Sequence, residues 1–478
     1  MKIVGRAAEQ DAINKYVESE SPEFVVVYGR RRIGKTFLIR EHFANKFTFY
    51  CTGLAKTELP PMMQLKAQLR TFNAALNQYG KIFYPVPETW FDAFEQLIHL
   101  LRYNKKKGKK VIFLDEMPWM DTPRSGFISA LEHFWNGWAS ARPDILLIVC
   151  GSATSWMMNN LIKNHGGLHN RVTQRIVLEP FTLGECEEFF KYKKIVMSRK
   201  QIVECYMILG GIPYYLSLIE KSLSLAQNID KLCFARTGAL YDEFSSLYAS
   251  LFRHSEHHVK VVETLGQKTK GLTRDEILKI SKLQGGGLSK TLEELEQCGF
   301  IRKYHSFNKK NKNMLYQLID FYTLFFLNFI RHRKHRDKHF WLNINKEPKH
   351  RAWSGYAFEM VCLAHVEQIR KKLGISGVVC NVASWKSLNE TPGAQIDLLI
   401  ERNDQIINLC EMKYSDAEFT VDRKYDENLR NKRAAFVRES KTRKTVFLTM
   451  VTTYGVKHNE YWGNIQSEVK MDDLFEIR

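Results

Sequence analysis

Residues 29–36 have the types and spacing of a phosphate-binding loop. They match the pattern G-x-x-x-x-G-K-[ST] in full and read Gly29, Arg30, Arg31, Arg32, Ile33, Gly34, Lys35 and Thr36. The glycines let backbone N–H groups turn toward phosphate oxygens, and the helix that follows would present its positive end to them. We therefore expect this loop and Phe37 to bind ATP, with Lys35 as a catalytic group on the β- and γ-phosphates and the Thr36 hydroxyl on Mg²⁺.

Two acids supply the second half of such a site. Asp115 and Glu116 come directly after Val111–Leu114, an apolar run that is typical of a buried strand. We expect Asp115 to bind Mg²⁺ and Glu116 to be the catalytic group that orients or polarises the attacking water. The alternative is a strand that ends in ordinary surface acids.

Two polar residues further along the chain each have two interpretations. Ser152 follows the apolar run Ile145–Cys150, and it either contacts the γ-phosphate and the water or caps a helix that begins near Thr154. Arg171 either stabilises transition-state charge as a catalytic group or forms a surface ion pair. An arginine that acts on a neighbouring copy requires an oligomer, so a homo-oligomer is one expected partner.

The C-terminal region carries a second set of groups with chemistry. On a strand, Glu411 and Lys413 share a face because side chains alternate with a period of two. Asp397 comes close to Glu411 if its strand pairs with theirs in antiparallel fashion. Two carboxylates beside a lysine can bind Mg²⁺ and activate water at a phosphodiester, so we expect Asp397 and Glu411 as metal ligands and Lys413 as the group that steadies charge.

The elements that must position the first set of residues read as a parallel α/β sheet. Phe24–Tyr28, Val111–Leu114 and Ile145–Cys150 are continuous apolar runs, which suit strands buried on both faces. Helical spacing separates them at Met62–Leu76 and Trp90–Leu101, and a helix at Thr36–Phe43 follows the loop.

The middle of the chain reads as helices followed by a winged helix. We expect helices at Leu183–Tyr192, Lys200–Leu209 and Tyr214–Glu220, and then the winged-helix helices at His257–Leu265, Thr273–Ser281 and Gly287–Cys298. A hairpin with a basic tip at 308–313 completes this outline. The third helix is rich in glutamate and lacks the side chains that read base edges, which favours a packing or switch role over sequence-specific DNA reading.

The last region reads as a helix followed by a small sheet. We expect a helix at Ser354–Lys372, strands at Gly377–Asn381, Gln395–Glu401, Ile406–Lys413 and Thr445–Val451, and a helix near Asp422–Arg438.

Five segments resemble the archaeal-type ATPases of the STAND/AAA+ group. They are VGR at 4–6, GRRRIGKT at 29–36, LDEMPW at 114–119, GS at 151–152 and GGIPYYL at 210–216. The resemblance covers about residues 1–320 and implies a nucleotide-binding domain, a helical lid and a winged helix. It also implies that Val4, Gly5 and Arg6 lie near the base and that Pro213 approaches the nucleotide.

The spacing D-x(13)-E-x-K from Asp397 to Lys413 is similar to that of the PD-(D/E)XK nuclease superfamily and of the DUF234 domain often joined to such ATPases. In that superfamily a preceding helix supplies another catalytic acid, which Glu359 matches. The sequence departs from the pattern because Ile396, rather than proline, precedes Asp397. The resemblance implies a restriction-endonuclease-like α/β domain. The alternative is a nuclease-like domain that binds nucleic acid or a partner and does not cut.

Composition narrows the partners and the compartment. The 478 residues include 71 Lys plus Arg and 52 Asp plus Glu, so the formal net charge is +19, which favours nucleic acid, DNA first, although many basic proteins bind nothing specific. No run of about 18 apolar residues and no apolar leader are present, so we expect no membrane contact and no secretion. Nine scattered cysteines without a C-x-x-C pair fit a cytoplasmic protein, and His332 and His335 stand in a basic run that does not suit zinc.

These patterns together predict an α/β protein of four domains. They are a P-loop ATPase core at 1–180, a helical lid at 181–250, a winged helix at 251–330 and a nuclease-like domain at 350–478. We expect an ATP- and Mg²⁺-dependent switch coupled to a DNA-binding C-terminal domain. This hypothesis leaves open whether the domain also cleaves DNA. The alternatives are a nucleotide-gated scaffold without nuclease activity and a transcription regulator that acts through the winged helix.

Overall fold

The computed structural model describes residues 2–55, 60–105, 107–163, 166–252, 255–268, 270–305, 307, 314–331, 339–344, 347–387 and 394–477. The expected basic hairpin tip at 308–313 and the histidines His332 and His335 lie outside the described residues. The chain divides into two compact units, Met1–Glu179 and Pro180–Arg478, and each is described by itself.

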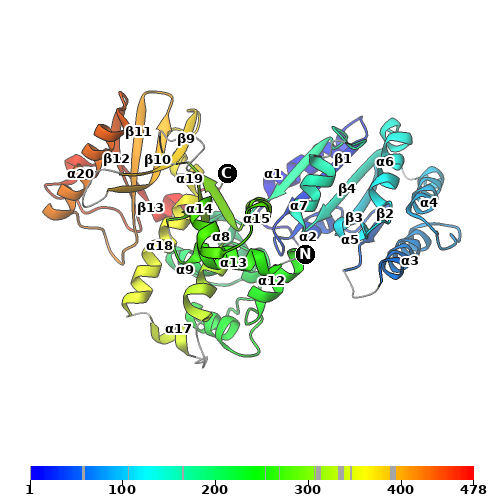
Figure 1. Cartoon of the computed structure of the whole chain (residues 1–478), viewed down its shortest axis with the longest axis horizontal. Coiled ribbons are helices and arrows are strands. Elements are labelled where there is room, and N and C mark those ends of the chain that lie inside the picture. Colours follow the sequence, from blue (N-terminus) through cyan, green and yellow to red (C-terminus); the bar gives the residue numbers. More distant parts are fainter. Residues whose placement is uncertain are drawn as a thin grey trace. The chain divides into compact units, whose positions relative to one another are not determined.

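The first unit is a five-stranded parallel sheet in the order β2-β3-β4-β1-β5 with helices on both faces (Figure 1). Its strands are β1 Glu23–Gly29, β2 Phe49–Thr52, β3 Lys110–Asp115, β4 Ile145–Gly151 and β5 Gln174–Leu178. Its helices are α1 Ala7–Glu18, α2 Lys35–His42, α3 Pro61–Tyr79, α4 Trp90–Tyr103, α5 Met117–Met120, α6 Phe127–Gly137 and α7 Thr154–Met157, with short turns of helix at Ala139–Ala141 and Met158–Ile162. The predicted parallel α/β sheet is confirmed.

The apolar runs of the central strands are explained by this two-sided cover. On β1, Phe24 and Val26 pack with α3, α4 and α6, whereas Val25 and Val27 pack with α1 and α2. Each strand is therefore buried on both faces, as continuous apolar runs require. The parallel arrangement also brings the carboxyl ends of β1, β3 and β4 to one edge of the sheet, where the loop and the acids lie.

The second unit begins with helices. They are α8 Leu183–Tyr192, α9 Arg199–Leu209, α10 Pro213–Ser217, α11 Leu225–Ile229 and α12 Glu243–Leu251, with a π-helical turn at Asp230–Phe234. There follow α13 Ser255–Gly266, β6 Leu272–Thr273, α14 Arg274–Ser281, α15 Gly285–Gln297, β7 Ile301–Tyr304 and β8 Leu315–Leu318. Strands β6, β8 and β7 form an antiparallel sheet, so this segment has the element order of a winged helix.

The chain then forms helices that lead to a second sheet. The helices are α16 Phe321–Phe325, a π-helical turn at Phe326–Ile330, α17 Phe340–Asn343, α18 Pro348–Ala364, α19 Val366–Lys372 and α20 Arg423–Ser440. The strands are β9 Cys380–Lys386, β10 Gln395–Arg402, β11 Ile406–Lys413, β12 Thr445–Thr452 and β13 Ser467–Lys470, with short 3-10 turns at Trp462–Asn464 and Met471–Phe475.

This second sheet is mixed and has helices on both faces. Its order is β13-β12-β11-β10-β9, with β9, β10 and β11 antiparallel and β11, β12 and β13 parallel (Figure 1). One face packs with α20, and the other belongs to a hydrophobic core that also includes α9, the winged helix and α18. The helices after residue 180, the winged helix and this sheet therefore share one core.

Several sequence-predicted elements are wrong in extent. The helix predicted at Tyr214–Glu220 ends at Ser217. The helix predicted at Ser354–Lys372 is interrupted at His365, which separates α18 from α19. The strand predicted at Gly377–Asn381 begins at Cys380 and runs to Lys386. Within the described residues, no helix is long and apolar enough to cross a membrane.

Candidate active sites

The phosphate-binding loop leaves the end of β1 through a position that only glycine can occupy. Gly29 has a φ of +146°, and a Cβ there would lie 2.3 Å from the backbone oxygen of Leu178 on the neighbouring strand β5. The buried Lys35 at the start of α2 donates hydrogen bonds from Nζ to the backbone oxygens of Gly29 and Arg30, both at 2.9 Å. The loop thus curls around the lysine at the positive end of α2.

Thr36 and Asp115, the magnesium ligands expected from the sequence, are in contact. The Thr36 hydroxyl donates to Asp115 Oδ1 at 3.0 Å, and the buried thiol of Cys150 donates to the same oxygen at 2.6 Å. Burial raises the pKa of Asp115, while the hydrogen bonds from Cys150 and Thr36 oppose this shift. A hydroxyl and a carboxylate in contact are the oxygen ligands that Mg²⁺ takes beside nucleotide phosphates, so these residues fit that ion.

Glu116 is held by the end of the adjacent strand. Its backbone is left-handed with φ +45°, and its carboxylate accepts hydrogen bonds from the Ser152 hydroxyl at 2.5 Å and the Ser152 N–H at 3.2 Å. Ser152 does not cap α7, because Ala153 is the N-cap residue and no side-chain cap bond forms. Cys150 on β4 and Ser152 just after it thus hold Asp115 and Glu116, the two acids at the end of the neighbouring strand β3.

The N-terminal segment reaches the same loop. The buried Arg6 donates from Nη2 to the backbone oxygens of Ile33 at 3.4 Å and Glu179 at 2.7 Å, and Val4 and Gly5 beside it are half-buried. Two other expected residues take no part in these hydrogen bonds, since Arg171 is exposed and the Phe37 side chain is 37% exposed on α2. Pro213 is the first residue of α10 in the second unit, and its approach to the nucleotide stays a prediction.

The C-terminal set gathers on neighbouring strands. Leu398 of β10 pairs with Cys410 of β11, which puts the adjacent Asp397 and Glu411 at the same end of the pair. Glu411 accepts from the Tyr425 hydroxyl at 2.8 Å and from Lys432 Nζ at 2.9 Å. Lys413 Nζ lies 3.2 Å from the same carboxylate.

The charges around Glu411 outweigh its burial. Burial alone would raise its pKa, but the ammonium groups of Lys432 and Lys413 lower it below its ordinary value. Glu411 is therefore held as a carboxylate by α20 and by its own strand.

Glu359 of α18 has the opposite electrostatic environment. Burial and the carboxylate of Asp397 raise its pKa to about 7, and Lys413 opposes this shift. Asp397 accepts a hydrogen bond from Gln395 Nε2 at 2.5 Å. Across the described part of the chain, no three His, Cys, Asp or Glu side chains are grouped closely enough to hold a metal ion by themselves.

We expect Glu359→Gln to stabilise the second unit more at pH 8 than at pH 4. The pKa of Glu359 is raised from 4.5 to about 7 on folding, so the folded state binds the proton more tightly and stability falls as pH rises between these values. The difference between the two pH values is at most about 3 kcal/mol. Thermal unfolding of wild type and variant at pH 4 and pH 8 measures it, and equal shifts at both pH values would contradict this account.

The sequence interpretation missed the residues that hold these acids in place. Cys150 lies on the run predicted as a strand, and its contact with Asp115 follows only from the neighbouring position of β3 and β4. Tyr425 and Lys432 lie on a helix that was predicted, but nothing in their spacing indicates that they face Glu411. Such partners are the outer groups that orient ligands and catalytic side chains.

Comparisons with known proteins bear on the first of the two sites. The chain is 24% identical over 425 residues to an uncharacterized protein of Methanocaldococcus jannaschii, a match that covers 87% of this chain and 88% of that protein. The structure is similar to the Walker-type ATPase of Pyrococcus abyssi, at 18% identity over 68% of this chain and 96% of that chain, with a TM-score of 0.47.

It is also similar to the Signal Transduction ATPase with Numerous Domains protein with a tetratricopeptide repeat sensor from Pyrococcus horikoshii. That match has 15% identity, covers 78% of this chain and 52% of that chain, and has a TM-score of 0.30. Residues 3–219 match the model of a family described as an ATPase domain predominantly from Archaea. The loop, Asp115 and Glu116 therefore lie within the part of the chain that is similar to this ATPase domain family.

Proposed function

We propose that the protein is a Mg²⁺-dependent, ATP-hydrolysing switch of the STAND type that controls a nucleic-acid-directed C-terminal domain. The observation that carries the ATPase half is the 3.0 Å hydrogen bond between the Thr36 hydroxyl and Asp115, with Glu116 positioned next to it. The complete loop pattern and the match to an ATPase family support this half.

Each residue of the first site has a separate role in this proposal. Lys35 and the loop N–H groups bind the phosphates, and Lys35 offsets the charge that develops on the transferred phosphoryl group. Thr36 and Asp115 would hold Mg²⁺, which would supply positive charge at the phosphate oxygens. Glu116 accepts a hydrogen bond from the attacking water, and Ser152 fixes the direction of that carboxylate.

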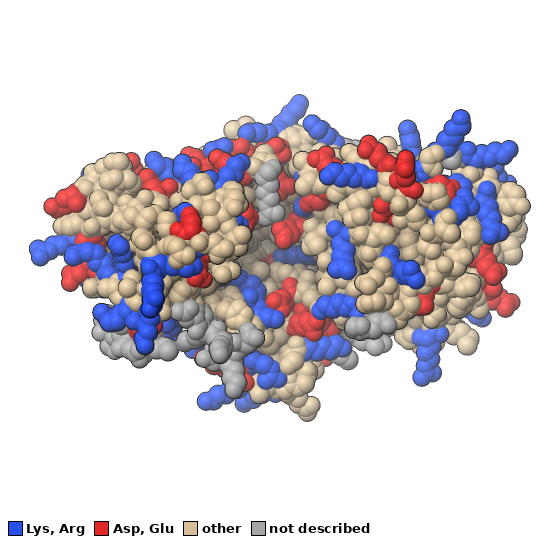
Figure 2. Space-filling view, turned by 90° about the horizontal axis from the view of Figure 1, so that it is seen from above, with Lys and Arg blue, Asp and Glu red and all other residues tan. Residues whose placement is uncertain are grey.

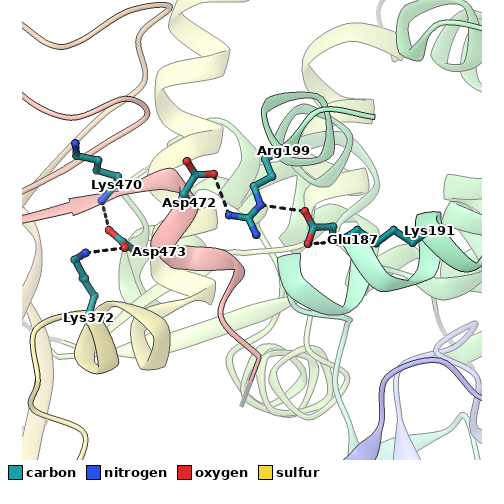
Figure 3. Close-up of polar contacts among 7 residues, drawn as sticks. All are labelled: Glu187, Lys191, Arg199, Lys372, Lys470, Asp472 and Asp473. Carbon is teal, nitrogen blue, oxygen red and sulfur yellow. Dashed lines mark hydrogen bonds and ion pairs between the residues drawn. The ribbon is translucent and has the colours of Figure 1, made fainter. Parts of the chain in front are cut away.

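The second unit is built to move as one body when the nucleotide changes. Arg199 of α9 donates to Glu187 of α8 at 3.0 Å and to Asp472 near the C-terminus at 3.2 Å (Figure 3). The buried His365 accepts a hydrogen bond from the Leu183 N–H at 2.9 Å. Exposed ion pairs contribute little, so the shared hydrophobic core is the main coupling between the helices and the C-terminal sheet.

The C-terminal domain is the effector in this proposal. Its order of helix, three antiparallel strands, helix and parallel strand supports the resemblance to the PD-(D/E)XK superfamily, with Glu359, Asp397, Glu411 and Lys413 at one end of the central strands. Basic and acidic side chains are interspersed on the face shown in Figure 2, so the net charge alone does not locate a nucleic-acid surface.

Cleavage of DNA by the full-length protein tests the effector half. We expect plasmid or single-stranded DNA to be cut in Mg²⁺ or Mn²⁺ in an ATP-dependent manner, and Asp397→Ala to lose this cutting, because a metal-activated water needs its carboxylate ligand. Lys441→Ala is the matched control, because Lys441 is exposed at the C-terminal end of α20, the helix that packs on the same sheet. Equal cutting by Asp397→Ala and wild type would contradict the assignment.

A second candidate function is a nucleotide-gated scaffold without nuclease chemistry. The observation that favours it is that both carboxylate oxygens of Glu411 already accept hydrogen bonds, from Tyr425 and Lys432. A metal ion would have to compete with these donors. ATP hydrolysis without any cutting by wild type would favour this candidate.

A further inference from the structure

The winged helix is docked on the edge of the C-terminal sheet that carries the acids. The Phe307 N–H donates to the backbone oxygen of Ser384 on the edge strand β9 at 2.8 Å, and the Phe307 ring lies 5.2 Å from that of Phe436 on α20. Gln317 of β8 contacts Met360 Sδ of α18 at 3.6 Å. Strand β7 comes shortly before Phe307 in the chain and pairs with β8, with Arg302 opposite Gln317, so these contacts place β7 beside the C-terminal sheet.

Within the described residues, the guanidinium of Arg302 on β7 is hydrogen-bonded through only one of its three nitrogens. Its Nε donates to Gln317 Oε1 at 2.8 Å, and its guanidinium carbon lies 4.8 Å from the ring centroid of Tyr304. Its two terminal nitrogens make no hydrogen bond or ion pair with any residue that the structure describes. Burial lowers the pKa of Arg302, and the attraction of Asp397 is among the effects that oppose this shift.

Two acids of the C-terminal site, Glu359 and Asp397, are also largely without protein partners. Glu359 makes no hydrogen bond or ion pair within the described ranges, and Asp397 accepts one hydrogen bond, from Gln395. Partly buried polar groups normally find partners inside the protein. Here a guanidinium and two carboxylates lie in one region without such partners. This arrangement indicates a binding site for an anionic ligand that brings its own counter-cation.

A phosphodiester is the ligand that suits this arrangement. Carboxylates alone would repel it, but a guanidinium presents a planar pair of N–H donors to two phosphate oxygens. Lys270 lies near enough to lower the pKa of Glu359, and its backbone oxygen accepts a hydrogen bond from the Tyr304 hydroxyl of β7 at 2.8 Å. By contrast, α15 of the winged helix carries Glu293, Glu294 and Glu296, which do not suit a phosphate backbone.

We propose that Arg302 of the winged helix completes the C-terminal site as a phosphodiester-binding residue, so that DNA is held between β7 and the C-terminal sheet. This inference rests on the proposed nucleic-acid-directed function and adds to it a named residue from a different domain. The winged helix then acts as one wall of the effector site and does not read DNA with α15.

Binding of a labelled DNA duplex and of its single strand, measured by fluorescence anisotropy in Ca²⁺ at several salt concentrations, tests this proposal. The proteins are full-length wild type, Arg302→Gln, Arg302→Lys and Lys303→Gln. Lys303 is the matched control because it is the next residue on β7, is exposed and pairs with Glu296 at 3.6 Å. Thermal unfolding of each variant verifies that it is folded.

We expect Arg302→Gln to weaken binding by about tenfold or more. The slope of log K against log salt should fall by about 0.9, the value for one lost phosphate contact with duplex DNA. Arg302→Lys should keep the slope, and Lys303→Gln should bind as wild type does. Wild-type affinity and slope in folded Arg302→Gln would overturn this proposal while DNA binding itself stands. Absence of DNA binding by wild type would overturn both the effector function and this proposal.

Discussion

Lys35→Ala is expected to remove ATP hydrolysis and to weaken ATP binding. The Lys35 ammonium is buried and donates to the oxygens of Gly29 and Arg30 at 2.9 Å, so it both shapes the loop and supplies the positive charge that faces the phosphates. Loss of a charge-assisted hydrogen bond should weaken binding by about tenfold or more, and loss of transition-state stabilisation should lower turnover by a further factor of about a hundred to a thousand.

Isothermal titration with an ATP analogue and phosphate release from ATP measure these two effects. Lys15→Ala is the matched control, since Lys15 is an exposed lysine on α1 of the same unit. We expect it to bind and hydrolyse ATP as wild type does. Unchanged affinity and turnover in Lys35→Ala would show that the loop is not the nucleotide site.

Glu116→Gln is expected to separate binding from turnover. Glutamine has nearly the same shape, and its amide oxygen can accept the hydrogen bonds from Ser152 that hold Glu116. The affinity for ATP should therefore stay within about threefold of wild type, whereas turnover should fall by about a hundredfold to ten-thousandfold because the water loses its carboxylate acceptor.

The neighbouring Ser152→Ala variant tests how Glu116 is positioned. It removes the hydroxyl donor and keeps the backbone donor, so its turnover should lie between those of wild type and Glu116→Gln. If Glu116→Gln lost binding and turnover together, Glu116 would be part of the binding site and not the residue that acts on the water.

The elements that could be predicted from the sequence are those whose own residues determine their secondary structure and burial. Phe24–Tyr28 is apolar throughout because both faces of β1 are covered, and the loop after it matches a complete pattern. Strand β5 could not be predicted in this way because it lies at the sheet edge and alternates between buried and exposed residues over only five positions. Short edge strands depend on their neighbour more than on their own sequence.

Tertiary contacts explain the errors in the C-terminal region. Helical spacing continues through His365, yet its Nε2 accepts from the Leu183 N–H and its Nδ1 donates to the Val361 oxygen at 2.8 Å, which fixes this residue at the junction of α18 and α19. The apolar Gly377–Asn381 run favours a strand, but pairing with β10 and with Phe307 of the winged helix places the strand at 380–386.

The two sites differ in how far sequence alone could define them. Thr36 and Asp115 follow from a pattern in which each residue has one role, and the structure brings them to 3.0 Å. Arg302 follows from no pattern, because its position beside Asp397 depends on how the winged helix packs against the sheet. A site built by two domains has no fixed sequence spacing, and only the folded chain reveals it.

The most direct test of the central claim is the release of phosphate from ATP by the full-length wild-type protein in Mg²⁺ and, in parallel, in EDTA. We predict steady hydrolysis in Mg²⁺ that stops in EDTA, because Thr36 and Asp115 act through the ion that they bind. Absence of hydrolysis in Mg²⁺, together with absence of ATP binding, would contradict the assignment of residues 29–36, Asp115 and Glu116 as an ATPase site.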